Sequence, residues 1–522
     1  MTDTQPYAGA QASVAVRMYR GLLGDCFLLT HSQGRRRYHA LIDCGVLQCI
    51  GSDKPATKAG AAHMKKVVAN LHADTGGRLD LVVGTHEHYD HLSGFQIAHD
   101  VFKTFDIGEV WLAWTENDLD DLAVAIRENG RKAVKALNAL VETEGLGLAA
   151  KDSEAAARIA AIANLMQFQD RRDPKDEDAP SAVDVLFGAA PRAKYDPADR
   201  PRSCADVIDW LKSRSGTPDR VRYLKPGETV RFGLDDALVA KVLGPPRSDR
   251  LLKLDPTEGD GKEVYLADRD TVAALVTTLG FHLGMDADPG VAAGATRRPF
   301  AQRFCRPVDE AKPAGEGAVE ALYFDPAAEA RRIDAEWLGT AEQLALKIDG
   351  DVNNTSLALA LEMPGPDRHV LLFPADAQVG NWLSWHDQTY PVTGDPAKTE
   401  TAEQLLGRVV LYKVGHHGSH NATAREKGLE MMCSPHLAAM IPVVEQVARE
   451  QTSRNNPEGW AMPYDKLYGR LKARTCGRII QGDGTAADEH AAFGKAGSIF
   501  RLAYADAGGQ DPLWVELSLP LA

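Results

Sequence analysis

Four side chains that can bind a metal ion fall within six consecutive positions of the sequence. They are His86, His88, Asp90 and His91. Imidazole nitrogen and carboxylate oxygen are ligands that suit zinc, manganese or iron. With only 16 histidines in 522 residues, this pattern should arise by chance in roughly one such chain in a thousand. A single histidine here would more often be structural, but the cluster predicts a metal site.

A predicted strand precedes this cluster and a predicted helix follows it. Residues 81–83 form a short apolar run, which is typical of a buried strand, and Gly84 and Thr85 end it. We expect residues 92–102 to form one helix. A turn directly after a strand can aim several side chains at one point, so these elements would position the four ligands.

Two later segments also place ligand-type side chains at the ends of predicted strands. Asp376 follows the strand at 369–373, and His416 and His417 follow the strand at 409–414. Asp376 is open to a second interpretation, because an aspartate before a helix commonly caps it. The adjacent pair His416 and His417 favours a metal site, whereas a single histidine at a strand end would be as consistent with a structural role.

The patterns at the two ends of the chain indicate strands and one amphipathic helix. Apolar residues predict strands at 14–19, 26–30 and 38–42. A 3.6-residue apolar period over 64–71 predicts a helix with one buried face. Residues 500–519 read as a hairpin across a Gly-Gly pair.

The motifs themselves resemble a known family. His86-Glu87-His88-Tyr89-Asp90-His91 resembles the H-x-H-x-D-H signature of the metallo-β-lactamase superfamily. Asn-Asn-Thr-Ser-Leu-Ala-Leu (353–359), Leu-Leu-Phe-Pro-Ala-Asp-Ala (371–377) and Leu-Tyr-Lys-Val-Gly-His-His-Gly-Ser (411–419) resemble the branch that contains the metallo-hydrolase domain of bacterial competence (DNA-uptake) proteins of the ComEC type. The resemblance implies an α/β fold, an αββα sandwich with one or two divalent ions, Zn or Mn, at one edge.

The resemblance also implies which residues hold the metals. The ligands would be, in chain order, His86, His88, Asp90, His91, Asp376 and His416. The first two would hold one ion, the next two the other, Asp376 would bridge the ions, and His416 would complete the second site. We rank His416 above His417 because it comes first off the strand, which leaves His417 as a catalytic proton-transfer residue.

Two further residues are expected around the ligands. The resemblance implies that Asp43 supports the ligand loop without touching a metal, although an aspartate there could merely cap a turn. The superfamily usually supplies one more histidine to the first metal, just before a strand, and Asn353 and Asn354 stand near that place. The first site is thus short of one strong ligand, and oxygen ligation by Asn354 or water would shift its preference towards Mn²⁺.

Two insertions interrupt the predicted core. We place its first part at 1–115, a helical insertion and linker at 116–220, core strands at 221–246, an insertion that could form a lid at 247–345, and its second part at 346–522. The resemblance covers about residues 13–115, 221–246 and 350–484, and the insertions lie outside it.

Composition limits the class of protein. Hydrophobic residues make up 44% and charged residues 25% of the chain, the balance of a globular protein, and the net charge of −14 gives no overall attraction to nucleic acid. The seven cysteines are odd in number and form no C-x-x-C, which fits free thiols in a reducing cytosol. The first 13 residues lack the apolar core of a signal peptide, and no apolar run approaches ~18 residues. We therefore expect a cytoplasmic protein that does not enter the membrane.

These observations predict a metal-dependent hydrolase. A metal ion lowers the pKa of bound water towards 7, Asp90 and Asp376 would orient the resulting nucleophile, and His417 would protonate the leaving group. The branch resemblance favours a phosphodiester substrate, in a nucleic acid or a nucleotide. The alternatives are hydrolysis of a lactone, thioester or amide, as in other superfamily members, and a non-catalytic metal-binding sensor, which the missing histidine would favour.

Overall fold

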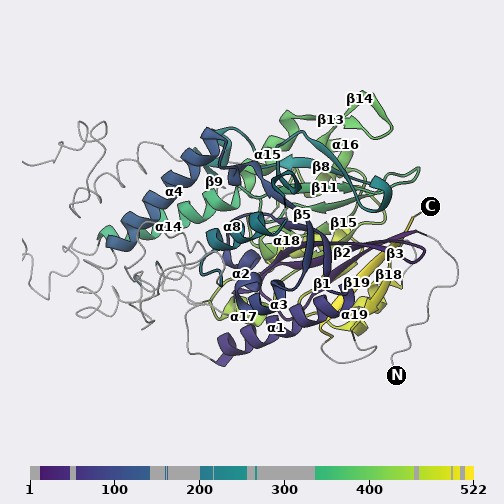
Figure 1. Cartoon of the computed structure of the whole chain (residues 1–522), viewed down its shortest axis with the longest axis horizontal. Helices are drawn as coiled ribbons and strands as arrows, with labels where there is room; N and C mark the ends of the chain where they lie inside the picture. Colours follow the sequence, from purple (N-terminus) through teal and green to yellow (C-terminus); the bar gives the residue numbers. More distant parts are fainter. Residues whose placement is uncertain are drawn as a thin grey trace, which may run out of the picture.

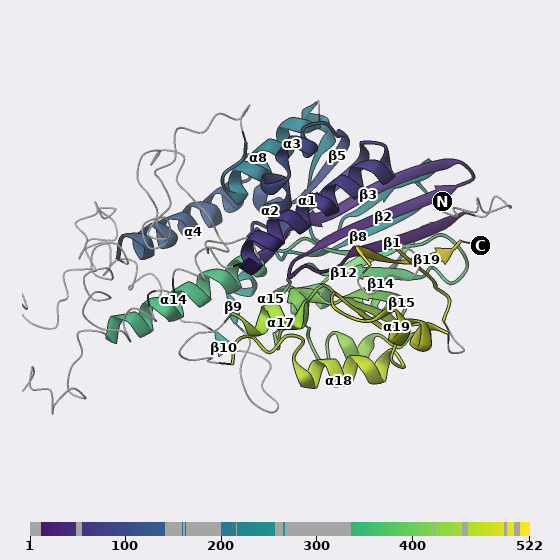
Figure 2. The ribbon, with the colours of Figure 1, turned by 90° about the horizontal axis from the view of Figure 1, so that it is seen from below.

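Two β-sheets pack face to face at the centre of the structure, with helices on the outer side of each (Figures 1 and 2). The computed structural model describes residues 12–47, 55–140, 159, 162, 200–215, 217–255, 265–266, 336–421, 423–451, 458–494, 498–505 and 512–521. This arrangement makes the protein a mixed α/β protein with four layers.

The first sheet has eight strands in the order β18-β19-β1-β2-β3-β4-β5-β6. Its strands are β1 (Ser13–Tyr19), β2 (Cys26–Gln33), β3 (Arg36–Cys44), β4 (Arg78–Gly84), β5 (Asp106–Ala113), β6 (Val221–Leu224), β18 (Arg501–Tyr504) and β19 (Trp514–Pro520). From β3 to β6 the neighbouring strands run parallel, whereas β18, β19, β1, β2 and β3 pair antiparallel.

The second sheet has seven strands in the order β17-β16-β15-β12-β11-β8-β7. Its strands are β7 (Thr229–Phe232), β8 (Leu238–Gly244), β11 (Ala358–Glu362), β12 (Val370–Phe373), β15 (Val409–Lys413), β16 (Ala438–Ile441) and β17 (Ile479–Gln481). Strands β12, β15, β16 and β17 run parallel. Two short pairs stand apart, β9 (Leu254–Asp255) with β10 (Tyr265–Leu266) and β13 (Thr389–Val392) with β14 (Asp395–Thr401).

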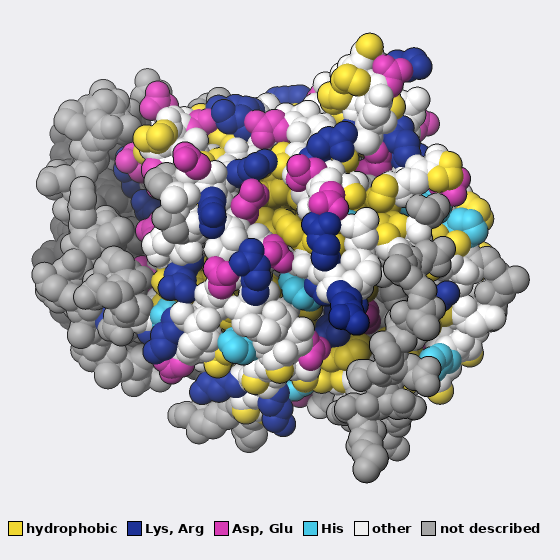
Figure 3. Space-filling model, turned by 45° about the vertical axis from the view of Figure 1, so that its right-hand side comes forward, with side chains coloured by type: hydrophobic (Ala, Val, Ile, Leu, Met, Phe, Trp, Pro, Cys, Tyr) yellow, Lys and Arg dark blue, Asp and Glu magenta, His cyan; other side chains and the backbone are white. Residues whose placement is uncertain are grey.

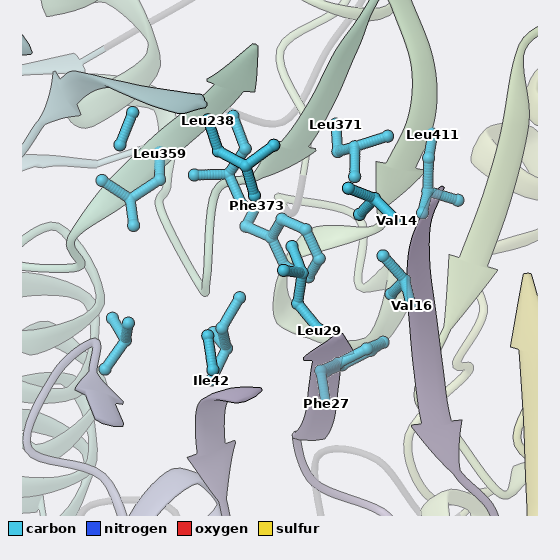
Figure 4. Close-up of a cluster of buried hydrophobic side chains, with 14 of the residues drawn as sticks. Val14, Val16, Phe27, Leu29, Ile42, Leu238, Leu359, Leu371, Phe373 and Leu411 are labelled. Carbon is cyan, nitrogen blue, oxygen red and sulfur yellow. The ribbon is translucent and has the colours of Figure 1, made fainter. Parts of the chain in front are cut away.

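Alternating residues of the strands divide between the two faces of each sheet. In β12, Leu371 and Phe373 point into the core between the sheets, and Val370 and Leu372 point to the helices outside. Figure 4 shows the inner core, where Phe27 from β2 and Phe373 meet edge to face with ring centroids 5.8 Å apart. Burial on both faces explains why the strands are nearly continuous apolar runs.

Helices close the two outer faces. The first sheet is covered by α1 (Pro55–Thr75), α2 (Tyr89–Ile97), α3 (His99–Phe102) and α8 (Cys204–Arg214). The second is covered by α15 (Val379–Ser384), α16 (Ala402–Leu406), α17 (Glu445–Arg449) and α18 (Asp465–Arg474). Helix α19 (Ala486–Phe493) adds Phe493 to the inner core. Two long helices, α4 (Asp121–Leu140) and α14 (Glu336–Asn353), lie side by side and extend beyond the sheets (Figures 1 and 2).

Most of the elements predicted from the sequence are present. The strands expected at 14–19, 26–30 and 38–42, the helix around 64–71 and the terminal strand pair are confirmed by β1, β2, β3, α1 and the β18–β19 pair. The prediction of one helix at 92–102 is wrong in detail, because the chain forms two helices, α2 and α3, with a break at Ala98. Helix α14 begins at Glu336, so it crosses the boundary predicted at residue 345.

The insertions can be followed only in part. Helices α4 and α8 lie in the first insertion, while most of the linker and almost all of the predicted lid fall outside the described residues. The five cysteines in the described part of the chain are free. Among the helices that the structure describes, we find none with the length and apolarity needed to cross a membrane.

Candidate metal centre

Loops at the ends of strands from both sheets meet at one edge of the sandwich. The carboxyl ends of parallel strands β3 and β4 deliver Asp43 and the ligand loop, which we define as residues 85–91 and which includes the first turn of α2. In the other sheet, β12 is followed by Asp376 and β15 by the turn Gly415–Gly418. Ligand sites commonly form at such strand ends, and the topology explains why these distant segments lie together.

Four donor atoms form the centre of this cluster. They come from Asp90, His91, Asp376 and His417, and all lie within 4.8 Å of one another. His417 Nε2 is 2.7 Å from Asp90 Oδ2, and His91 Nε2 is 3.1 Å from Asp376 Oδ2. All four side chains are buried. Two carboxylates and two imidazoles at these separations could hold a metal ion.

Several polar atoms of the cluster are buried without a hydrogen bond in the described part of the chain. They are Asp25 Oδ1, Asp90 Oδ1, His91 Nε2 and Asp376 Oδ2. The 3.1 Å contact between His91 and Asp376 is therefore close without being aligned as a hydrogen bond. Buried polar atoms without a hydrogen bond are rare and require an explanation. A cation between these atoms would supply the missing partner.

The outer nitrogens of the two central histidines are held by the protein. His91 Nδ1 lies 2.8 Å from Asp43 Oδ2, and His417 Nδ1 lies 3.0 Å from Pro442 O. A carboxylate or carbonyl that binds one ring nitrogen fixes the tautomer and leaves the other nitrogen free to bind a metal. Asp43 also accepts hydrogen bonds from the Thr85 backbone and hydroxyl, at 2.9 and 2.7 Å, so it ties β3 to the ligand loop.

The two remaining histidines of the motif lie beside this group. His86 Nε2 and His88 Nδ1 are 3.1 Å apart, while the other nitrogen of His86 faces Thr85 Oγ1 at 3.1 Å. The rings of His86 and His91 are 4.2 Å apart between centroids. His86 and His88 therefore form a second pair of donors next to the central four.

A buried ammonium balances part of the negative charge. Lys413, the last residue of β15, forms an ion pair with Asp25 and lies 3.4 Å from Asp376 Oδ1. Burial lowers the pKa of Lys413, but Asp25 and Asp376 outweigh that effect and raise it to about 12. The site thus contains one fixed positive charge among four buried carboxylates, those of Asp25, Asp43, Asp90 and Asp376.

Charge pairing sets the protonation state of the central four residues. Burial alone would raise the pKa of Asp90, but His91 and His417 lower it to about 2. The pKa of Asp376 is likewise held well below its usual range, because His91 and Lys413 outweigh burial. Conversely, burial would lower the pKa of both rings, but the carboxylates raise that of His91 well above its usual value and raise that of His417.

The outer histidines behave differently. Burial, followed by the charges of His91 and His88, lowers the pKa of His86 well below its usual range. Burial also lowers the pKa of His88 to about 3. Both rings are therefore neutral at physiological pH, which is the form that binds a metal.

Unfavourable backbone conformations concentrate in the loops that deliver these residues. Asp43, Ala375, His416 and His417 have φ between 43° and 54°. Such left-handed conformations cost energy in residues other than glycine and are often found at functional sites. At Gly45 an added Cβ would lie 2.1 Å from the carbonyl carbon of Asp90, so only glycine allows the ligand loop to approach β3 this closely.

Of the two histidines after β15, the structure does not bring the predicted ligand His416 into the central cluster. His417, and not His416, contributes a nitrogen to the central cluster. His416 is less buried; its Nδ1 faces Asn421 Oδ1 at 3.1 Å, and its backbone N–H donates to Asp376 Oδ1 at 2.9 Å. Burial lowers its pKa. The turn reverses the order because both residues adopt left-handed conformations, which a strand pattern does not describe.

Asn354 also differs from expectation. Its amide donates to Leu254 O at 3.2 Å and accepts from the backbone N–H of Asn381 at 3.2 Å. Both ends of the side chain are therefore used to hold neighbouring backbone. Of the two asparagines, Asn353 is the one whose buried side-chain oxygen, Oδ1, has no hydrogen bond within the described part of the chain.

The sequence analysis did not single out three charged residues at the site. Asp25 follows Gly24 in a stretch that we interpreted only as the start of a strand, and Lys413 lies within a strand pattern. Asp349, on α14, lies 3.6 Å from His88; burial, followed by the charges of Asp90 and Asp376, raises its pKa to about 8. The only local signal was a charged residue inside an apolar strand, at Lys413.

Metal affinity should rise with pH above about 6.5, the ordinary pKa of an imidazole. In the metal-free protein the raised pKa values keep His91 and His417 protonated above the ordinary imidazole value, and a metal must displace those protons to bind. Asp90 and Asp376 stay ionised throughout, whereas Asp349, whose pKa is raised to about 8, also loses its proton as the pH rises and adds to the dependence. Calorimetric titration with Mn²⁺ at several pH values, in buffers of different ionisation enthalpy, measures the protons released. His417→Gln should lower that number by about one, whereas a pH-independent affinity would contradict the assignment.

We compared the chain with known proteins. No family model matches it, and no curated protein does so either.

Proposed function

We propose that the protein is a metal-dependent hydrolase of the metallo-β-lactamase type, with its active site at the edge where the two sheets meet. The observation that carries the proposal is the convergence of Asp90, His91, Asp376 and His417 within 4.8 Å. Their arrangement, contributed by both sheets of a four-layer α/β protein, is consistent with the resemblance of the sequence motifs to that superfamily.

The residues present fit a divalent ion. Asp90, His91, Asp376 and His417 would hold one ion, and His86 and His88, beside them, would contribute to a second. The unpartnered buried oxygens and nitrogen of the cluster support a cation there, because buried polar atoms normally have a partner. When bound, the ion would lower the pKa of water and stabilise negative charge on the substrate.

The remaining groups have roles that follow from their surroundings. Lys413 and the backbone N–H of His416 bind the same oxygen of Asp376 and so fix the orientation of that carboxylate. His416 lies beside the cluster at the less buried side of the turn, and its lowered pKa leaves the ring neutral. A neutral imidazole in that position is suited to accept a proton from the attacking water. We therefore assign proton transfer to His416 and metal binding to His417.

A phosphodiester is the substrate that we favour, on the basis of the motif resemblance to the ComEC-type branch. The net charge of −14 weakens the case for a long polynucleotide, because polyanion binding depends on positive charge. On the face shown in Figure 3, Lys and Arg side chains alternate with Asp and Glu and form no broad basic surface. A nucleotide or a short single strand therefore fits the protein better than a long duplex.

The decisive experiment measures hydrolysis of single-stranded DNA, double-stranded DNA and cyclic or linear dinucleotides with Mn²⁺ or Zn²⁺. We expect cleavage by the wild type and a loss of about 10³-fold or more in Asp90→Ala, since the variant lacks a charged ligand. Metal content is measured on the same samples.

The outcomes separate the candidate functions. A protein that holds metal but cleaves none of these substrates would overturn the phosphodiesterase proposal and direct the search to lactones, thioesters and amides. A protein with no bound metal and no metal-induced rise in thermal stability would overturn the hydrolase proposal itself.

A further inference from the structure

Helix α14 brings an acidic side chain against the outer pair of histidines. Asp349 Oδ1 lies 3.6 Å from His88 Nε2, and the Asp349 side chain keeps only 18% of its accessible surface. Nearly all of α14 lies before residue 350, outside the segments that resemble the superfamily. A histidine of the main motif thus contacts a residue that lies before the nearest motif, which begins at Asn353, the last residue of α14.

The geometry distinguishes the two nitrogens of His88. Its Nδ1 is 3.1 Å from His86 Nε2, which is about the separation of two nitrogens that each lie ~2.0–2.1 Å from one ion. Its Nε2 points instead to Asp349. A ring that gives Nδ1 to a metal carries its proton on Nε2, and a carboxylate is the usual acceptor for that proton.

Asp349 is itself held in place, and so is the end of its helix. Asp349 Oδ2 accepts a hydrogen bond from Asn353 Nδ2 at 3.2 Å, and Asn353 is fully buried. The residues that follow bind both ligand loops: Leu357 N–H donates to Thr85 O at 2.9 Å, and Ser356 Oγ accepts from Asp376 N–H at 3.2 Å. The position of α14 is therefore fixed relative to the metal centre.

We propose that Asp349 is a positioning residue for His88, and that α14 is in this way a part of the outer metal subsite. The inference rests on the proposed function, because it assigns a partner to a ligand of that same site. In the structure the two atoms are 3.6 Å apart and do not form a hydrogen bond. When an ion is bound, a small approach of the two side chains would let Asp349 accept the Nε2–H of His88 and hold the ring with Nδ1 towards His86 Nε2.

The test compares three variants by calorimetric titration with Zn²⁺ and by ¹⁵N NMR of the histidine rings in the Zn²⁺-loaded protein. Asp349→Ala should weaken one of two metal sites by about 10–100-fold and leave the other unchanged. Asp349→Asn, which keeps an oxygen acceptor, should restore most of that affinity. Asp351→Ala is the matched control, because Asp351 lies on the same helix and pairs with Lys347 at 2.5 Å. The NMR spectrum should show the Nε2–H tautomer of His88 in the wild type and in Asp349→Asn.

Each outcome of these measurements supports or contradicts the proposed role of Asp349. Two unweakened sites in Asp349→Ala, or equal weakening of both sites, would overturn the role of Asp349 while leaving the hydrolase proposal intact. If metal affinity fell as far in Asp349→Asn as in Asp349→Ala, the positioning role would also be overturned. Asp349 would then act through its charge and not as a hydrogen-bond acceptor. Absence of metal from the wild type would overturn the proposed function and this inference together.

Discussion

Replacing Asp376 by asparagine should reduce hydrolysis by about 10³-fold, the order found when one preorganised charged or polar group of an active site is removed. The side chain lies 3.1 Å from His91, 3.8 Å from His417 and 3.4 Å from Lys413. Asparagine keeps the size and the bond to the His416 backbone but loses the negative charge that faces the cluster. We also expect the metal content of the purified variant to fall, as measured by mass spectrometry of the eluted ion.

Asp395→Asn provides the comparison for this substitution. Asp395 pairs with Lys398 on the surface of the β13–β14 hairpin, so the same chemical change there should leave metal content and rate unaltered. An Asp376→Asn protein that retained its full metal content and a rate within tenfold of the wild type would remove Asp376 from the active site.

Lys413→Met should destabilise the metal-free protein by about 3–5 kcal/mol, the cost of leaving buried charges without their partner. The Lys413 ammonium lies between Asp25 and Asp376, and all three side chains are almost fully buried. A bound divalent ion would replace part of the lost positive charge. Urea unfolding of the variant should therefore show a smaller deficit with Mn²⁺ than with a chelator.

A second buried lysine makes this prediction specific. Lys241 is fully buried and lies 3.8 Å from Glu400, in the second sheet on β8. Lys241→Met should also destabilise the protein, but by the same amount with and without Mn²⁺. If Mn²⁺ reduced the loss of stability equally in both variants, the result would contradict a link between Lys413 and the metal site.

The sequence predicted the elements of the fold better than their ends. Apolar runs and the helical period identified the inner strands and α1, because burial on both faces of a sheet leaves a strong pattern. The break between α2 and α3 has no such pattern, because Ala98 is neither glycine nor proline, the residues that commonly mark the end of a helix. Directly after the break, the His99 ring packs on Trp210 of α8 with centroids 5.1 Å apart, a tertiary contact that the local sequence does not indicate.

The candidate site was predictable where its residues are adjacent in sequence. His86, His88, Asp90 and His91 form a recognisable cluster, and Asp376 was found through its place at a strand end. Lys413 and Asp349 act on the site through contacts with residues far along the chain, and no local pattern distinguishes them from other charged residues. The choice between His416 and His417 depended on backbone conformation, which the sequence did not indicate.

The contribution of both sheets to one cluster has a consequence for protein synthesis. Asp90 and His417, whose side chains touch, are 327 positions apart. At ~5–20 residues per second, the histidine loop leaves the ribosome roughly 20–60 s before the turn that completes the cluster. During that interval the nascent chain can offer an ion only part of the central cluster, which lacks His417, so we expect metal to be acquired after translation has passed residue 417. Once bound, the ion would join the ends of the two sheets.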